Sequence, residues 1–252
     1  MRSRSMFADR NFTAATVVGA AMGLSLYGGM LLQPLFFEGI LQFPTFDTGL
    51  AMVPRGVGSL VSMLLVGRLL PKFGAKKLIY FGIAVSLVGA WMLTGLSLDA
   101  NGRSTLVPLL LQGFGVGFVF IPLSAVAFAT LPKGIATEAA GVYNLIRSIG
   151  TSIGISIVSV YMTRGAQASW SALRGYVDPY RFEVQQYLDP MHLKAHGAGL
   201  AMVAQQAALQ AQMLGLLQAF WLIVASFVAM IPLVALLKPG KGRAAPEVVA
   251  AG

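Results

Sequence analysis

The 252-residue sequence contains no cysteine and only two histidines. Without cysteine, disulfides, thiolate metal ligands and cysteine nucleophiles are all excluded. His192 and His196 stand four residues apart, a spacing that places two ligands on one helix face, with Asp189 as a third candidate. Their segment, DPMHLKAHGAG, has helix breakers on both sides. The sequence therefore favours a solvated loop over a metal site, and it predicts no metal or other cofactor.

Charged residues are also scarce. They make up 11% of the sequence, against about 25% in soluble domains, whereas hydrophobic residues make up 56% and the mean hydropathy is +0.74. So few charges cannot solvate a globular surface, which indicates that much of the surface faces lipid. The 18 Lys and Arg outnumber the 9 Asp and Glu, and a basic balance can indicate a nucleic-acid partner. Here the basic residues lie in the breaks between apolar runs, which favours a membrane protein without nucleic acid.

Six apolar runs approach the length of about 20 residues that a membrane-spanning helix needs. The first run is too long for a signal peptide and has no small-residue cleavage site after it, so it is predicted to be a retained span. The sequence thus predicts an all-α membrane protein, with residues 1–12 before the first span, a long outer loop at 163–212 and a tail at 238–252. The six predicted spans are 13–37, 48–66, 78–96, 106–131, 139–162 and 213–237.

Lysine and arginine in the short loops predict the orientation. Cytoplasmic loops carry an excess of these residues, and long loops contribute little to the rule. An N-terminus in the cytoplasm leaves only Arg103 in the short outer loops and places both termini inside. Arg164, Arg174, Arg181 and Lys194 then lie in the long outer loop. The basic residues that this orientation places inside are Arg2, Arg4, Arg10, Arg68, Lys72, Lys76, Lys77, Lys133, Lys238, Lys241 and Arg243.

The loop after the second predicted span carries a recognisable motif. GRLLPKFGAKK resembles the G-x-L-A-D-R-x-G-R-K signature of the major facilitator superfamily. The resemblance implies close helix contact at the first glycine, a tight turn at the second, and basic groups among helix carbonyls and lipid headgroups. Pro71 replaces the aspartate of the family's conformational lock, so this copy is interpreted as structural. The residues assigned to this gating loop are Gly67, Arg68, Lys72, Gly74 and Lys76.

Longer stretches extend the resemblance from Arg10 to Pro239. NFTAATVVGAAMGLSLYGGMLLQPLFF, GLAMVPRGVGSLVSMLLVGRL, LLLQGFGVGFVFIPLSAVAFATLP and AAGVYNLIRSIGTSIGISI look like the C-terminal half of the fourteen-span drug/proton antiporters of the EmrB/QacA type. The resemblance implies one six-helix half-bundle that exports amphipathic, cationic compounds by proton antiport and alternating access. It also implies a location in the plasma (inner) membrane of a bacterium.

The same resemblance implies partners. They are a small-molecule substrate, protons, the lipid bilayer, an N-terminal half that carries the proton-coupling carboxylate, and a periplasmic adaptor protein. The alternative is a non-transporting scaffold, or a degenerate half-transporter, that binds another protein in the membrane. Neither interpretation is an enzyme, because no catalytic set of residues can be assembled from the sequence. GFGVGF has glycines spaced much as in a nucleotide-binding loop, but it lies within a span and is interpreted as helix packing.

Two ionisable residues lie within the predicted spans. Arg55 and Arg147 are each about 12 Å from a span end at the helical rise, a position that costs about 2.5–3.5 kcal/mol and suggests function. Each is predicted to face a substrate cavity or, alternatively, to snorkel or to tie helices together through carbonyls. Asn144, one turn before Arg147, is expected to help hold that guanidinium.

Uncharged polar residues complete the predicted site. In the resembled family the first and fourth spans line the cavity, so Tyr27, Gln33 and Gln112 are candidate substrate contacts. Their alternative role is hydrogen bonding between helices. Carboxylates occur only near predicted span ends, at Glu38, Asp47 and Glu138, and Glu38 is the one candidate for proton coupling.

Overall fold

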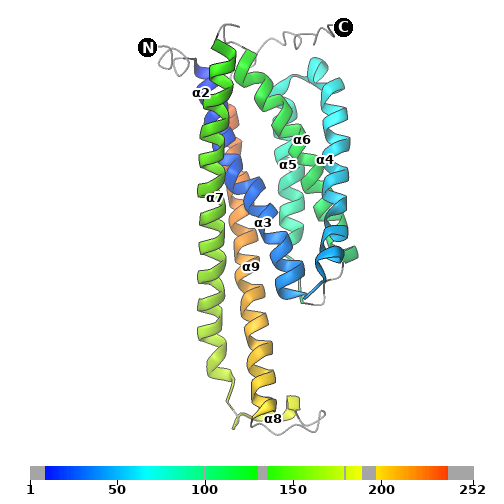
Figure 1. Cartoon of the computed structure of the whole chain (residues 1–252), viewed down its shortest axis with the longest axis vertical. Helices are drawn as coiled ribbons and strands as arrows, with labels where there is room; N and C mark the ends of the chain where they lie inside the picture. The colour runs from blue at the N-terminus through cyan, green and yellow to red at the C-terminus, as the bar shows by residue number, and fades with distance from the viewer. Residues whose placement is uncertain are drawn as a thin grey trace.

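The computed structural model describes residues 9–98, 100, 102–129, 135–178, 180–188 and 197–237. Within these ranges the chain forms helices and no strand. The predicted class, an all-α membrane bundle, is confirmed: six helices are long and apolar enough to cross a membrane. They stand side by side, and α2 begins at the end of the bundle where α9 finishes (Figure 1). The six candidate spans are Asn11–Ile40, Thr45–Phe73, Ala75–Leu93, Ser104–Ala129, Ala136–Tyr176 and Ala198–Ala235.

The first span is one long helix interrupted by two π-helical turns. Asp9 begins it, because its carboxylate accepts hydrogen bonds from the backbone N–H groups of Asn11 and Phe12, both at 2.9 Å. The Ser25 hydroxyl, in the first π turn, lies 2.8 Å from that of Ser226 on the last span. Pro34, which has no N–H to donate, lies directly before the second π turn. The four segments are α2 (Arg10–Met22), η1 (Gly23–Tyr27), α3 (Gly28–Pro34) and η2 (Leu35–Ile40).

Most of the other spans are longer helices than the hydropathy of the sequence indicates; Ala75–Leu93 is the exception, with 19 residues, as many as its predicted span. α7 continues to Leu173 and α9 begins at Ala198, so much of the predicted loop 163–212 is helical. Alanine and glutamine in 198–212 favour helix, whereas hydropathy reports only the part of a helix that is apolar. The remaining elements are α4 (Thr45–Phe73), α5 (Ala75–Leu93), α6 (Gly102–Ala129), α7 (Ala136–Leu173), η4 (Arg174–Tyr176), α8 (Phe182–Leu188) and α9 (Ala198–Ala235).

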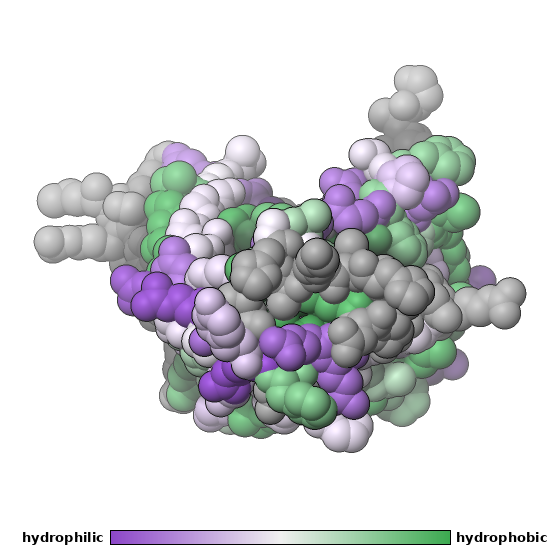
Figure 2. Space-filling view, turned by 90° about the horizontal axis from the view of Figure 1, so that it is seen from below, coloured by the Kyte–Doolittle hydropathy of each residue, from purple (hydrophilic) through white to green (hydrophobic). Residues whose placement is uncertain are grey.

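α7 and α9 extend beyond the other helices at the end where α8 lies (Figure 1). Viewed from that end, hydrophilic residues gather on the end face and hydrophobic residues show along the sides (Figure 2). This distribution suits helices whose sides face lipid and whose ends face water. The histidine pair at 192 and 196 lies outside the described residues. So do Asp189 and several basic residues used for orientation: Arg2, Arg4, Lys133, Lys194, Lys238, Lys241 and Arg243.

Glycines in α6 bring its neighbours into close contact. α4 and α5 both pack along α6, and they touch each other only slightly. A Cβ at Gly113 would overlap the backbone oxygen of Arg55 on α4, and one at Gly115 would overlap the Ser86 hydroxyl on α5. Without strong hydrophobic attraction between helices in lipid, such close backbone contact is a main source of association. The interpretation of GFGVGF as helix packing is therefore confirmed.

Candidate substrate-binding site

Three polar side chains from three spans meet inside the bundle. Gln33 of α3 is 2% exposed and Gln112 of α6 is 4% exposed. Arg55 of α4 donates from Nη1 to Gln33 Oε1 at 2.8 Å, and Gln33 donates from Nε2 to Gln112 Oε1 at 2.7 Å. These three residues, here called the polar cluster, form a continuous chain of hydrogen bonds. The structure thus brings together three residues that the sequence nominated separately.

Arg55 also reaches the first span at a second point. Its Nη2 donates to the backbone oxygen of Leu26 at 3.2 Å, and Leu26 lies in the π turn η1. π turns occur often at functional sites because they distort the regular backbone ladder. A contact of this kind is the alternative role that the sequence left open for Arg55, tying helices together through carbonyls, although the sequence did not indicate which carbonyl.

Small residues position the polar cluster. Gly113 follows Gln112 directly, and its missing side chain lets the Arg55 backbone approach α6. A Cβ at Gly29 would lie 3.9 Å from Gln112 Oε1, and one at Gly89 would lie 3.1 Å from Gln112 Cγ. Gln112 is therefore surrounded by backbone on two sides, and its amide is directed toward α3. The close packing explains why so polar a group is almost fully buried.

The charge of Arg55 has only neutral acceptors among the hydrogen bonds described here. These acceptors are the side-chain amide oxygen of Gln33 and the backbone oxygen of Leu26. A guanidinium is planar, remains charged and carries several N–H donors, only part of which these contacts use. Neutral acceptors stabilise the cation without cancelling its charge. The polar cluster is thus suited to binding an anionic or strongly hydrogen-bonding group.

The second membrane arginine lies elsewhere in the bundle. Arg147 is half-buried on α7, and its guanidinium carbon lies 4.8 Å from the centre of the Phe120 ring on α6. This geometry is a cation–π contact. Asn144, expected to hold the guanidinium, is exposed, and the contact recorded for Arg147 is with Phe120 instead.

Tyr143, which sequence analysis did not nominate, lies one turn before Arg147. Its side chain is 4% exposed, and its ring centroid is 5.5 Å from that of Phe128 in an edge-to-face arrangement. An added Cβ at Gly19 of α2 would lie 3.1 Å from the Tyr143 hydroxyl. The sequence offered one clue to Tyr143: it lies four residues before Arg147, a spacing that places both side chains on one helix face.

The remaining nominated residues do not take part in the hydrogen bonds that join the polar cluster. Tyr27 is half-buried in η1, and the hydrogen bonds of the cluster do not include it. Glu38 is exposed near the end of the first span. Among the aromatic residues of these spans, Phe36, Phe37 and Phe118 are each at most 2% exposed, so these rings pack in the protein core. Their position favours core packing over a stacking surface for a ligand.

The segment predicted as the gating loop is helical except at Gly74, because α4 continues to Phe73 and α5 begins at Ala75. It joins α4 to α5 and contacts α9. Gly74 has φ +78° and ψ 154°, a conformation that glycine adopts readily. Lys76 donates from Nζ to the backbone oxygens of Ala235 at 2.9 Å and Leu237 at 3.1 Å, at the end of the last span. Carbonyls at a helix C-terminus lack helical partners and attract cations. The loop is thereby attached to the last span.

Two further parts of the gating-loop prediction can be compared with the structure. Arg68 and Lys72 are exposed. The expected close helix contact at Gly67 is wrong for the described residues, because nothing lies within 4 Å of an added Cβ there. Gly67 lies on the open side of α4, whereas its neighbour Val66 is fully buried.

Six membrane-length helices around buried polar groups define a multi-pass membrane protein of the kind to which transporters belong. The profile of the Major Facilitator Superfamily matches residues 2–155. Because this match covers more than half of the sequence, the chain belongs to the Major Facilitator Superfamily.

Comparison with curated relatives shows which transporters the chain resembles. The chain is 24% identical over 245 residues to the Multidrug export protein EmrB of Escherichia coli, covering 94% of this chain and 47% of the relative. It is 25% identical over 240 residues to the Fatty acid resistance protein FarB of Neisseria gonorrhoeae, covering 93% and 47%. It is 26% identical over 155 residues to the Colistin resistance protein EmrB of Acinetobacter baumannii, covering 62% and 30%. The chain therefore spans about half the length, or less, of these relatives.

Proposed function

We propose that this chain acts as the C-terminal half of a multidrug exporter. It works with a second six-helix half, and the two rock around a central cavity to expose a substrate alternately to each side of the membrane. Family membership and the printed name of one relative, the Multidrug export protein EmrB, support a role in export. The observation that carries the proposal is the polar cluster, because an ionisable group buried within membrane spans is costly and therefore suggests a functional site.

The substrate contact in this half is the polar cluster. A substrate with an acceptor group competes with Gln33 for the Arg55 guanidinium, so binding changes the hydrogen bonds that tie α4 to α3. A change in these ties is a direct way for a substrate to favour one arrangement of the helices over another. α4 and α7 are the least buried of the spans, which suits helices that pack against the second half.

We assign different roles to the two halves on the basis of charge. The resemblance to drug/proton antiporters favours cationic amphipathic substrates and proton antiport, whereas Arg55 and Arg147 favour negative charge in this half. We therefore place the coupling carboxylate and the cation contact in the second half. Glu38 remains the candidate carboxylate for proton coupling in this chain. The protein is proposed to lie in the plasma membrane of a bacterium, with both termini cytoplasmic and a periplasmic adaptor as a further partner.

A second candidate function is a membrane scaffold that binds a partner without transport. The large exposed areas of α4 and α7 favour it, because they suit any helical partner in the bilayer. The two functions differ in their response to substrate. A transporter half is stabilised by a ligand that it binds, whereas a scaffold is not.

Co-expression with the N-terminal half of a matching exporter tests the proposal. Efflux is measured in cells loaded with a cationic dye and, separately, with an anionic amphipathic dye. We expect Arg55→Met to lower efflux at least tenfold, because it removes the donors that contact substrate. Arg174→Met is the matched control, since Arg174 is exposed outside the long helices, and it should leave efflux unchanged. The transport proposal would be contradicted if neither dye is exported, or if the Arg55→Met and Arg174→Met variants export dye equally well.

A further inference from the structure

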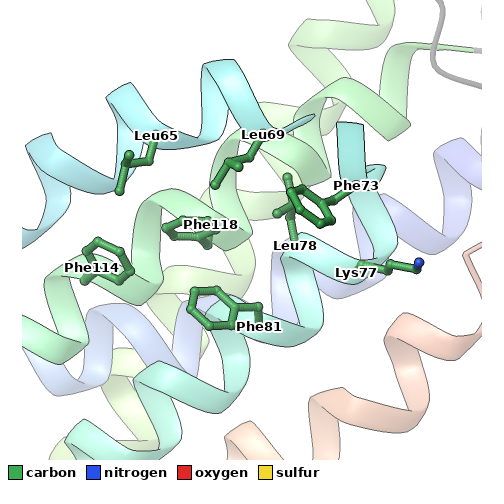
Figure 3. Close-up of a pocket in the computed structure, with 8 residues that line it drawn as sticks. All are labelled: Leu65, Leu69, Phe73, Lys77, Leu78, Phe81, Phe114 and Phe118. Carbon is green, nitrogen blue, oxygen red and sulfur yellow. The ribbon is translucent and has the colours of Figure 1, made fainter. Parts of the chain in front are cut away.

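A groove runs along the surface of the bundle between α4 and α5. The two helices are joined at Gly74 and both pack on α6, yet they hardly touch each other, so α6 forms the floor between them. The volume of the groove is about 430 Å³, within the range of about 300–1,000 Å³ that is usual for ligand sites. Figure 3 shows the eight residues that line it: Leu65, Leu69, Phe73, Lys77, Leu78, Phe81, Phe114 and Phe118.

The floor of the groove is aromatic and well ordered by packing. Phe118 is 1% exposed, and its ring centroid lies 5.0 Å from those of Phe81 and Phe114. The walls, by contrast, are open: Phe73 is 55% exposed and Phe81 is 49% exposed. An apolar surface of this kind is filled by apolar atoms when the protein lies in a bilayer, because an empty groove forfeits dispersion contacts.

One end of the groove is cationic. Lys77 is exposed near the start of α5, and its ammonium nitrogen points away from the rings (Figure 3). Arg68 and Lys72, also exposed, lie near the end of α4 and do not line the groove. Lys76 differs, because its ammonium group is held by the carbonyls at the end of α9. The groove therefore combines a long apolar part with a positive end.

The dimensions match a lipid that stands in the bilayer. Leu65 and Phe73 are eight residues apart on α4, which is about 12 Å of helix axis. The groove thus extends from the loop toward the middle of the membrane, as an acyl chain does below its headgroup. Basic residues close to the ends of membrane helices attract anionic headgroups.

We propose that the α4–α5 groove binds one anionic phospholipid. The acyl chain lies along Leu65, Leu69 and the rings of Phe81, Phe114 and Phe118, and the headgroup phosphate pairs with Lys77. The lipid fills the gap between α4 and α5 and thereby supports the hairpin that carries the gating loop. This site is separate from the polar cluster, and the proposal does not depend on transport.

The test measures lipid retention by the full chain. The protein is reconstituted in vesicles of equal phosphatidylglycerol and phosphatidylcholine, re-extracted in mild detergent, and its bound lipid is counted by native mass spectrometry. We expect one phosphatidylglycerol per chain, enriched about fivefold over phosphatidylcholine, the factor that corresponds to about 1 kcal/mol for a basic group near an anionic surface. Lys77→Gln should abolish the enrichment, Lys77→Arg should keep it, and Leu65→Trp, which fills the groove, should lower retention of both lipids.

Lys72→Gln is the matched control, because Lys72 is an exposed lysine in the last turn of α4, close to the turn at Gly74, and does not line the groove. It should retain phosphatidylglycerol as the unmodified chain does. The proposal is wrong if the two lipids are retained equally, if Lys72→Gln and Lys77→Gln lose the enrichment equally, or if Leu65→Trp retains lipid unchanged. Circular dichroism of each variant verifies that it is folded, and Lys77→Gln, at an exposed position, is expected to pass.

Discussion

Adding one methyl group at Gly113 tests how the polar cluster is positioned. The Cβ of Gly113→Ala would overlap the backbone oxygen of Arg55 and would lie 2.7 Å from its carbonyl carbon and 2.9 Å from its Cα. All three are backbone atoms, so no side-chain rotation relieves the collision and α4 must move away from α6. Overpacking of this kind costs about 1–3 kcal/mol.

The displacement of α4 has a second cost. It lengthens the hydrogen bonds from Arg55 to Gln33 and to the Leu26 carbonyl, now 2.8 and 3.2 Å, and hydrogen bonds between membrane helices average about 0.6 kcal/mol each. Alanine recovers about 0.5–1 kcal/mol through its better helix propensity. Taken together, these effects predict a net loss of about 1–3 kcal/mol in the free energy of unfolding.

Reversible unfolding in mixed micelles of mild detergent and sodium dodecyl sulfate measures this loss. Gly141→Ala is the matched control, because an added Cβ on that exposed glycine of α7 meets nothing within 4 Å. The control should be as stable as the unmodified chain or slightly more stable. If Gly113→Ala is as stable as Gly141→Ala, then α4 and α6 are not as closely packed as described, and the account of how Arg55 reaches Gln33 fails.

Three further changes probe contacts between spans. Lys76→Met removes the cation at the end of α9 and should lower the free energy of unfolding by about 0.3–1 kcal/mol, measured by the same unfolding assay. Gln33→Leu should cost about 1–3 kcal/mol, because it leaves Gln112 without its donor; adding Gln112→Leu should cost less than the sum of the two single changes. Phe120→Leu should lower the free energy of unfolding by about 0.5–2 kcal/mol through the lost cation–π contact. Adding Arg147→Met to that variant should cause no further loss.

Each of these three has a result that contradicts it. Unchanged stability in Lys76→Met would show that the carbonyls at the end of α9 need no cation. Strict additivity of the two glutamine changes would show that the amides do not interact. Equal losses from Arg147→Met in the presence and absence of the Phe120 ring would refute the cation–π contact.

The number of membrane spans and the all-helical class could be predicted because they depend on apolar length, which a single sequence displays. The turn at Gly74 could be predicted for a similar reason, since the loop motif is local and glycine tolerates a positive φ. The full length of α7 could not, because hydropathy falls where a helix leaves the apolar region while its backbone hydrogen bonds continue.

Sequence patterns could not predict which residues of distant segments contact each other. Gln33, Arg55 and Gln112 were nominated because each is polar within a span, but their meeting depends on how closely α4 approaches α6 at Gly113. The attachment of Lys76 joins residues 159 positions apart or more. Gly67 shows the converse, because a motif position expected to touch a neighbouring helix faces open space in this bundle.

The π turn at Gly23–Tyr27 has a consequence for length variation in the first span. A π turn carries one residue more than an α-helical turn. Removing one residue from this turn would restore a regular helix and leave every later side chain in its present direction. The same deletion in α2 would rotate all that follows by roughly 100° and send the Gln33 amide away from Arg55. Insertions and deletions in relatives of this chain should accordingly concentrate at the turn.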